Sequence, residues 1–379
     1  MWYKRFELLF SDVVAPVYAR ENGGGMAFWM HFARKMRTFL FGIFIFMGFN
    51  SAHGIIHYVS LSGTNNPPYT NWAGAATNIQ WAVNSATTGD TVLVSNGIYY
   101  LTNQIIISTV ITTKSVNGWA VTVVDGNNYP DKPVTNRCFY ITAAATLDGF
   151  TVRNGYAADN AAGGGGVYLS AEAYVQNCKI THNITSNATS LFYGGGVFLT
   201  IGATLRNSLV CYNYSNYKGG GVSLYSSYGN IQNCTIVSNK STEGGGIHGA
   251  AKYPYTSRVE NVVCYFNTGG TTSNFIPASG TGWLYIVNSC IAPASSFPIV
   301  GMFGYSYTNN IESDPQIVNK DIGDFRLSAG SPCINSGLNQ SWMSGAVDPD
   351  GRSRIDRFSR VVDMGCYEYL PQGFMFSVP

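Results

Sequence analysis

Four glycine runs at regular spacing constrain this chain more than any other feature. Each run ends in a β-branched residue that opens a short apolar segment, and these residues are Val167, Val197, Val222 and Ile247. The steps between them are 30, 25 and 25 residues. Self-similarity at a period of roughly 20 to 50 residues is typical of solenoids and other arrays. The pattern therefore predicts a repeat protein in which each period forms one structural unit.

A second motif lies between the glycine runs and indicates the shape of the unit. It contains an apolar residue, an exposed residue, a turn Asn, a short strand and a second Asn, and its clear copies are 175–183, 205–213, 231–239 and 259–267. Period-2 alternation sends the aliphatic side chains inward, and Asn tolerates the tight turns between strands. We expect stacked amides at one corner, formed by Asn177, Asn207, Asn233 and Asn261.

The glycine runs fit the opposite corner of the same unit. There the backbone must take a positive φ and leave no side chain between coils that stack about 4.8 Å apart. The glycines expected in this role are Gly165, Gly195, Gly220 and Gly245. Together the two motifs predict an all-β, right-handed parallel β-helix. Leucine-rich repeats fit less well because Leu is scarce and no helix runs through three glycines, and propeller blades need periods of roughly 40 or more.

A single helical pattern precedes the repeats. Residues 77–86 place apolar side chains on one face, Thr77 and Gln80 form a capping box, and Gly89 supplies the stop. A solenoid needs to cover the open backbone edge of its first coil. We therefore predict that this helix is an N-terminal cap.

Residues 1–54 read as a leader. Basic residues at 34, 35 and 37 precede the apolar run 39–49, and small residues follow at 52 and 54. This order predicts a secretory signal that starts at Met36 or Met30 and is cleaved near Gly54. An uncut membrane anchor is the alternative, although eleven apolar residues are few for a bilayer span. The mature chain is then expected to be secreted or to lie at the cell surface or outer membrane of a bacterium, without a transmembrane span.

Composition narrows the range of partners. Only 11% of residues are charged, and the chain after the leader is near neutral. A nucleic-acid partner is disfavoured because phosphate binding needs clustered Lys and Arg. We expect a monomer whose cysteines are buried thiols. Cys333 and Cys366 could instead form a disulfide.

Two stretches resemble known bacterial proteins. The GGG[VI] runs with Asn-ended strands, over residues 147–290, look like the repeats of polymorphic outer-membrane proteins and the wider pectate-lyase-like group. The segments Asp314-Pro315, 324–327, 331–337 and 363–368 resemble the choice-of-anchor Q domain. The resemblance implies an exported bacterial protein, possessing a β-helix over 55–311 and a C-terminal module over 312–379 that closes the solenoid.

The resemblance also implies where catalysis could occur. Many pectate-lyase-like proteins act on acidic polysaccharides, with a Lys or Arg base or with paired carboxylates. Outward positions of the aligned coils provide only weak catalytic candidates, which are Asp148, Lys179 and Arg206. No two carboxylates occupy adjacent coils at one of these positions, so a solvated polar face is the competing interpretation.

Few residues in the sequence are candidates for binding a metal ion or a sugar. Asp348 and Asp350 resemble the start of a calcium loop, but its later ligands are missing and a plain turn is the alternative. Tyrosines crowd the segments around the glycine runs and could stack on sugar rings or simply pack there, and they include Tyr168, Tyr193, Tyr217 and Tyr225.

These observations favour an exported, non-catalytic β-helix protein that presents a long polar and aromatic face to a polysaccharide or cell-surface glycan. No cofactor is expected, apart from the Ca²⁺ that the Asp348 turn could bind. A polysaccharide lyase or glycoside hydrolase is the first alternative, and a passive structural stalk is the second.

Overall fold

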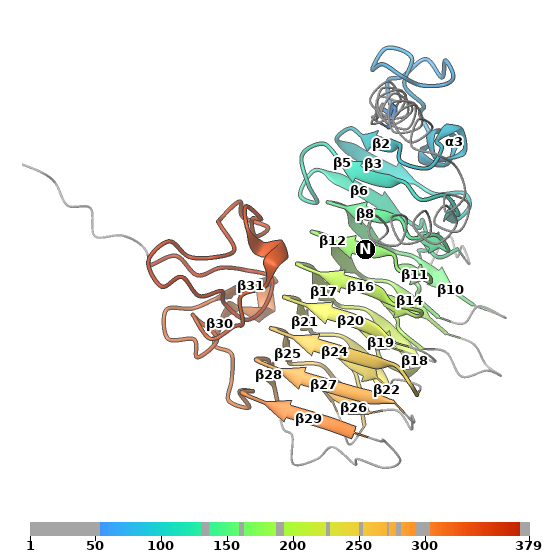
Figure 1. Cartoon of the computed structure of the whole chain (residues 1–379). Coiled ribbons are helices and arrows are strands. Elements are labelled where there is room, and N and C mark those ends of the chain that lie inside the picture. Colours follow the sequence, from blue (N-terminus) through green and yellow to red (C-terminus); the bar gives the residue numbers. More distant parts are fainter. Residues whose placement is uncertain are drawn as a thin grey trace, which may run out of the picture. The chain divides into compact units, whose positions relative to one another are not determined.

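The computed structural model describes residues 54–129, 136–158, 163–186, 193–224, 228–249, 253–270, 273–277, 282–292 and 304–371. These residues belong to one compact unit that starts at Gly54. They form a right-handed parallel β-helix whose strands stack in register along one axis (Figure 1). The predicted fold class is confirmed. The predicted leader lies outside the described residues, and among those described no helix is long and apolar enough to cross a bilayer.

Successive coils contribute strands to three long parallel sheets and one short one. Sheet A contains β1 (Ile56–Val59), β2 (Thr91–Val94), β5 (Thr112–Ser115), β8 (Thr146–Asp148), β12 (Tyr174–Gln176), β16 (Ala203–Arg206), β20 (Gly229–Gln232), β24 (Thr256–Glu260), β27 (Trp283–Val287) and β29 (Gly304–Thr308). Sheet B contains β3 (Gly97–Tyr100), β6 (Thr122–Asp125), β9 (Thr151–Arg153), β13 (Lys179–Thr181), β17 (Leu209–Cys211), β21 (Thr235–Val237), β25 (Val263–Tyr265) and β28 (Cys290–Ile291).

The other two sheets follow the glycine runs and the second Asn. Sheet C contains β4 (Ile105–Ile107), β7 (Phe139–Ile141), β11 (Val167–Leu169), β15 (Val197–Leu199), β19 (Val222–Leu224), β23 (Ile247–Gly249) and β26 (Phe275–Pro277). Sheet D contains β10 (Tyr156–Ala157), β14 (Ile184–Thr185), β18 (Tyr214–Lys218) and β22 (Lys240–Glu243). Short strands ended by Asn or Gly explain why each coil turns so sharply.

The register of the coils matches the alignment of the repeats. Val175 pairs with Leu205, which pairs with Ile231, which in turn pairs with Val259. All four side chains are fully buried in a single core that fills the inside of the solenoid. The apolar positions of the repeat therefore point inward, as the alternation predicts.

The two Asn corners differ in their hydrogen bonding. The first corner, between sheets A and B, contains the predicted Asn177, Asn207, Asn233 and Asn261, each with φ between 48 and 56°. Its amide stack is partial, with bonds of 2.6 Å from Asn207 to Asn177 and 3.1 Å from Asn261 to Asn233. The continuous ladder belongs to the second Asn of the motif, where the amides of residues 183, 213, 239 and 267 bond in sequence at 2.9 to 3.0 Å.

The glycine corner differs from the prediction by one residue. The left-handed conformation belongs to the glycine that precedes each predicted position, for example Gly194 with φ of 67°. The predicted glycines are Gly165, Gly195, Gly220 and Gly245, and a Cβ on any of them would lie 2.2 or 2.3 Å from a carbonyl oxygen of a neighbouring segment. Each run therefore needs one glycine for its backbone angle and the next for space.

The helix α3 (Ile79–Ser85) covers the first strands, and its start differs from the prediction. Asn78 is the N-cap, because its side-chain oxygen accepts a hydrogen bond from the backbone N–H of Gln80. The Thr77 hydroxyl instead donates to the Asn65 side chain. The Gln80 side chain bonds both the N–H and the carbonyl of Ile106 on the edge strand β4. This contact satisfies backbone groups that an uncovered sheet edge would leave open.

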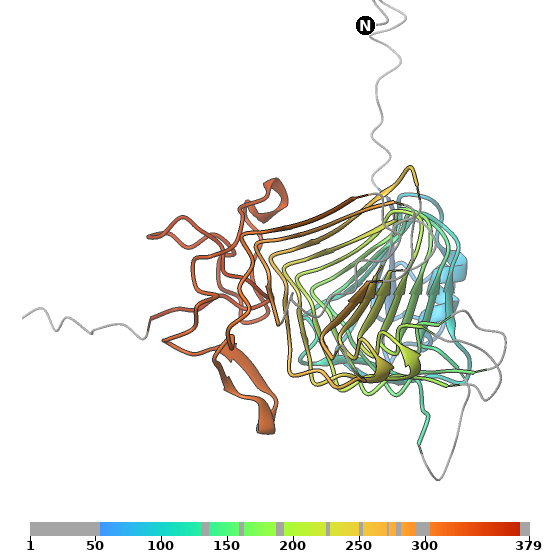
Figure 2. The same cartoon turned by 90° about the horizontal axis from the view of Figure 1, so that it is seen from below.

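Residues 312–371, here called the flank module, contain little regular structure. Their elements are β30 (Ile317–Asn319), the 3-10 helix η3 (Lys320–Ile322), β31 (Asp324–Leu327) and the 3-10 helix η4 (Ser341–Met343). Outward side chains of sheet B pack against the module, including Leu209 and Val237 beside Phe325. Figure 2 shows the module beside the coils. It covers the side of the solenoid, whereas the sequence predicts that it closes the end.

The first Asn corner holds this module in place. Asn207 donates to the Val347 carbonyl at 2.8 Å, and Asn261 donates to the Leu338 carbonyl at 2.8 Å. The structure does not contain the optional Cys333–Cys366 disulfide, because the two residues lie in different clusters. Cys333 packs with Cys290, and Cys366 packs with Cys211. All eight thiols are free and buried.

Candidate functional site

The outer face of sheet C carries a row of aromatic side chains. In each strand the residues on either side of the middle position enter the core, as Val167 and Leu169 do, so the middle residue faces outward. The parallel register aligns these middle residues from coil to coil, in the order Tyr140, Tyr168, Phe198, Ser223 and His248. The ring centroids are 4.8 Å apart for Tyr140 and Tyr168 and 5.4 Å apart for Tyr168 and Phe198. We call this row the aromatic face.

An arginine lies over one end of the aromatic face. The Arg137 guanidinium is 5.2 Å from the ring centroids of both Tyr140 and Tyr168. Its side chain is only 7% exposed, and burial lowers its pKa. Its Nη1 has no hydrogen-bond partner among the described residues. The guanidinium thus lies beside two neighbouring phenol rings, with one buried N–H donor that no described residue pairs.

The other end of the face contains a buried serine and histidine. Ser223 Oγ and His248 Nδ1 are 3.0 Å apart, and burial lowers the pKa of His248 to about 3. The imidazole is therefore neutral across the physiological range. Tyr193 stacks on it at 4.9 Å, and Tyr217 meets Tyr193 edge-on at 5.2 Å.

The structure thus brings three of the four predicted tyrosines to one surface. Tyr168, Tyr193 and Tyr217 all belong to the aromatic face or its border, and each is partly exposed. Tyr225 lies outside the described residues. Sequence reasoning missed Arg137, Phe198 and the Ser223–His248 pair. The signal for the last three was present, because each is the second residue after a glycine run, at the position that Tyr168 occupies.

The weak catalytic candidates do not come together. Strand pairing places Gln176 beside Asp148, whereas Lys179 lies on sheet B and pairs with Thr151. Asp148 accepts from the side chains of Gln176 and Asn177 at 3.1 and 2.7 Å. Its closest cation is Lys114, whose Nζ is 3.8 Å from Asp148 Oδ2.

Arg206 has a role in joining the two parts of the molecule. Its guanidinium lies 5.1 Å from the rings of both Tyr174, on the solenoid, and Trp342, in the flank module. It also donates to Gln176 Oε1 at 2.9 Å. These contacts connect η4 to sheet A.

Protein groups already occupy the carboxylates suggested for calcium. Asp348 Oδ1 accepts from the backbone of Asp350 and Arg352, and its Oδ2 accepts from the backbone of Glu368. Arg326 binds the Asp350 carboxylate with two bonds of 2.6 and 2.8 Å. The described residues contain no cluster of three or more His, Cys, Asp or Glu arranged to hold a metal. Calcium would therefore have to displace Arg326.

Comparisons with known proteins found similar folds among solved structures. No protein-family model and no curated protein matches the chain. Among solved structures, pectate lyase Pel9A matches with 16% identity over 83% of this chain and 96% of its own, with a TM-score of 0.47. The pectin methylesterase from Aspergillus niger matches with 12% identity over 78% and 97%, with a TM-score of 0.42. PemA, a pectin methylesterase from Erwinia chrysanthemi, matches with 12% identity over 73% and 93%, with a TM-score of 0.38. At these identities the likeness concerns the fold alone.

Proposed function

We propose that this protein binds an extended polysaccharide and that the aromatic face is where it binds. Sugar rings pack on aromatic faces without needing a charge, and Tyr adds a hydroxyl that can hydrogen-bond. The partly exposed rings of Tyr140 and Tyr168 follow one another along the solenoid axis, and the buried Phe198 continues the row beneath the surface. A row of this kind suits a linear chain better than a compact ligand.

The observation that carries the proposal is the unpaired donor of Arg137. A buried polar group without a partner costs about 1 to 3 kcal/mol, so a ligand that supplies an acceptor there gains affinity. A guanidinium binds carboxylates with two parallel bonds, which makes a uronic acid the best-matched sugar. The phenol rings of Tyr140 and Tyr168, which lie on one side of the guanidinium, help to hold it in place for that contact.

Binding to oligogalacturonate, measured by calorimetry on the mature chain, tests the proposal. We expect Arg137→Ala to weaken binding by about tenfold or more, because a charge-assisted pair is lost. Arg137→Lys should fall in between, since an ammonium keeps the charge but not the planar geometry.

Arg258 offers a matched control on another sheet. It also lies over a tyrosine, at 4.9 Å from the Tyr285 ring, and its partner is Glu260. Arg258→Ala should leave affinity unchanged. Equal losses in both variants, or the absence of any binding by the unmodified chain, would contradict the proposal. A passive stalk predicts that no glycan is retained.

One observation favours the enzymatic alternative. Lys114 and Asp148 lie at a cleft of about 290 Å³ between sheet A and the turn at Asp348. A lysine beside a carboxylate can move protons, as a lyase or hydrolase requires. Release of unsaturated ends or reducing sugars from acidic polysaccharides, abolished by Lys114→Met, would support this function over binding without cleavage.

We also propose that the chain is exported by a bacterium and that the flank module corresponds to a choice-of-anchor Q domain. The support is the basic, apolar and small residue order of 34–54 and the Asp- and Gly-rich segments beyond residue 312. Sequencing the N-terminus of secreted material is the test. A first residue near Gly54 is expected, and an intact leader would refute export by cleavage.

A further inference from the structure

A gap in a second aromatic row lies between the solenoid and the flank module. At the turn before the buried Asn ladder, successive coils place His182, Tyr212, Ser238 and Phe266 in the same left-handed conformation, with φ between 55 and 57°. Equal backbone angles in stacked coils give their side chains the same direction. His182 and Tyr212 accordingly stack, with ring centroids 5.3 Å apart. Ser238 interrupts the row because it has no ring.

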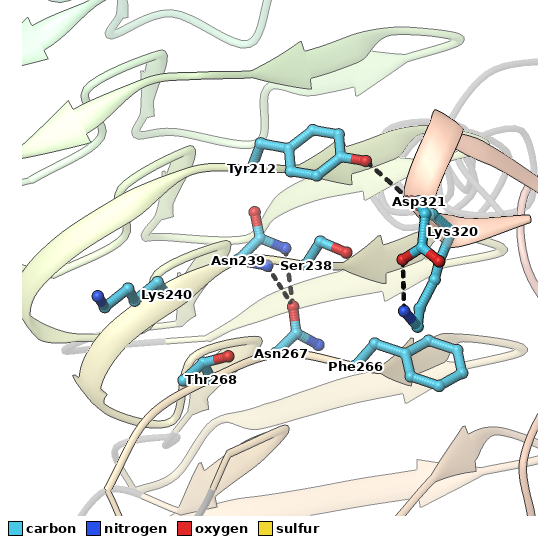
Figure 3. Close-up of a pocket in the computed structure, with 9 residues that line it drawn as sticks. All are labelled: Tyr212, Ser238, Asn239, Lys240, Phe266, Asn267, Thr268, Lys320 and Asp321. Carbon is cyan, nitrogen blue, oxygen red and sulfur yellow. Dashed lines mark hydrogen bonds and ion pairs between the residues drawn. The ribbon is translucent and has the colours of Figure 1, made fainter.

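The missing ring leaves a slot between two aromatic walls. Figure 3 shows Tyr212 on one side, Phe266 on the other and Ser238 between them. Two strand spacings of about 4.8 Å separate the walls by about 9.6 Å. Carbon contacts of about 3.5 to 4 Å with each wall take up about 7 to 8 Å of this gap, and the remainder admits the pucker of a saturated six-membered ring. The surrounding pocket has a volume of about 620 Å³, which lies within the usual range for ligand sites.

The flank module completes the slot and holds one wall. Lys320 and Asp321 of η3 line the open side (Figure 3). The Tyr212 hydroxyl donates to the Lys320 carbonyl at 3.2 Å, and Phe325 packs against the Tyr212 ring at 5.7 Å. A wall that is fixed before binding costs less entropy when a ligand arrives.

The polar groups of the slot favour a neutral ligand with hydroxyls. Lys320 Nζ and Asp321 Oδ1 form an ion pair at 2.5 Å, so their charges cancel. The amides of Asn239 and Asn267 are fully used by the ladder and the backbone. The groups that remain to hydrogen-bond the hydroxyls of a ligand are the side chains of Ser238 and Thr268 and the Asp321 carboxylate. Stacking on both faces with a few hydrogen bonds at the edge is how proteins bind neutral sugar rings.

We propose that this slot binds one neutral pyranose ring of an oligosaccharide, separately from the acidic ligand of the aromatic face. The slot lies at the turns between sheets B and D and beside the flank module, whereas the aromatic face lies on sheet C. The flank module thereby forms part of a binding site. The two sites share no residue, so an experiment can disprove one proposed site and leave the other supported.

The substitution Ser238→Tyr fills the slot with a side chain that the fold accepts at the same backbone angles one coil earlier, in Tyr212. The probes are cellohexaose, xylohexaose and mannohexaose, with binding followed by saturation-transfer NMR and calorimetry. We expect at least one to bind the unmodified chain and Ser238→Tyr to weaken that binding by about tenfold or more. Phe266→Ala, which removes a wall, should do the same.

Two controls keep the outcome specific. Ser238→Ala keeps the slot open and should change affinity by less than about threefold, and Arg137→Ala should leave neutral hexasaccharide binding unchanged. Unchanged binding by Ser238→Tyr, or no binding of any neutral probe to the unmodified chain, would overturn the inference. Loss of neutral binding with retained oligogalacturonate binding would establish two independent sites.

Discussion

Single residues decide which side chains each coil can accommodate, and the glycine runs show this most clearly. A repeated Gly-Gly-Gly reveals a corner but not which glycine takes which role, because every glycine permits a positive φ. The structure separates the roles. Gly194 takes the left-handed angle, while Gly195 lies where a Cβ would be 2.3 Å from the Tyr214 carbonyl oxygen and 2.4 Å from that of Gly220. Only three-dimensional stacking could distinguish them.

Gly195→Ala should lower the free energy of unfolding by about 3 kcal/mol, since two coils would have to separate to admit one methyl group. Gly118→Ala is the control, because Gly118 has a φ of 81° but no atom within 4 Å of an added Cβ. That change should cost about 1 to 2 kcal/mol from backbone strain alone. Urea unfolding measures both, and equal losses would show that crowding at the corner is unimportant.

His248 should make stability depend on pH. Its pKa is about 3 in the fold and roughly 6.5 in an unfolded chain, so protonation favours unfolding. The stability held by the neutral imidazole is complete above about pH 6.5 and is lost as the pH falls toward 3, by up to about 1.4 kcal/mol per pH unit. His248→Gln should remove this dependence. Urea unfolding between those pH values measures the difference, and parallel curves would rule it out.

At the scale of strands and corners, much of the arrangement could be predicted from the sequence. The Asn-ended motif gives the pairing of Val175, Leu205 and Ile231, because register in a solenoid follows from aligning repeats. What the pattern could not reveal is the second use of Asn207 and Asn261. A turn Asn looks the same in sequence whether its amide meets water, another amide or a carbonyl of a distant segment. Contacts over 77 and 140 residues have no local signal.

Asn261→Asp should loosen the flank module. The Asn261 amide donates to the Leu338 carbonyl and its oxygen accepts from the Leu338 N–H, so a carboxylate would place negative charge against that carbonyl in a buried site. We expect a loss of about 3 kcal/mol and faster hydrogen exchange at the Leu338 amide. Asn230→Asp, at a partly exposed position on sheet A, should cost less than about 0.5 kcal/mol. Unaltered exchange at Leu338 would contradict the assigned contact.

For the whole molecule, the aromatic face and the slot could be predicted only in part. Periodicity places Tyr168, Phe198, Ser223 and His248 at one register position, so the row could be inferred once the middle residue of each strand is known to face outward. Arg137 precedes β7 outside any repeat, and no periodic signal points to it. The slot needs Lys320 and Asp321 from the module, whose position beside the coils no repeat pattern contains.

The cysteines provide a test of the whole fold. All eight are buried as free thiols, and burial raises the pKa of Cys178 and Cys366 to about 12. Native protein should therefore resist alkylation, because the thiolate is the reactive form. After denaturation without reductant, mass spectrometry should find eight labels. A count of six would indicate that Cys333 and Cys366, or another pair, had formed a disulfide.

The position of the flank module has a consequence for how the repeat array can evolve. Tyr367 packs against Trp119 near the start of the solenoid, whereas Ser336 accepts from Asn288 near its end. One short segment therefore makes contacts matched to the number of coils between those points. Duplicating or deleting a coil there would shift every later contact by about 4.8 Å. The flank module thus matches a fixed number of coils. The number of repeats in this span can change only if the flank module changes with it.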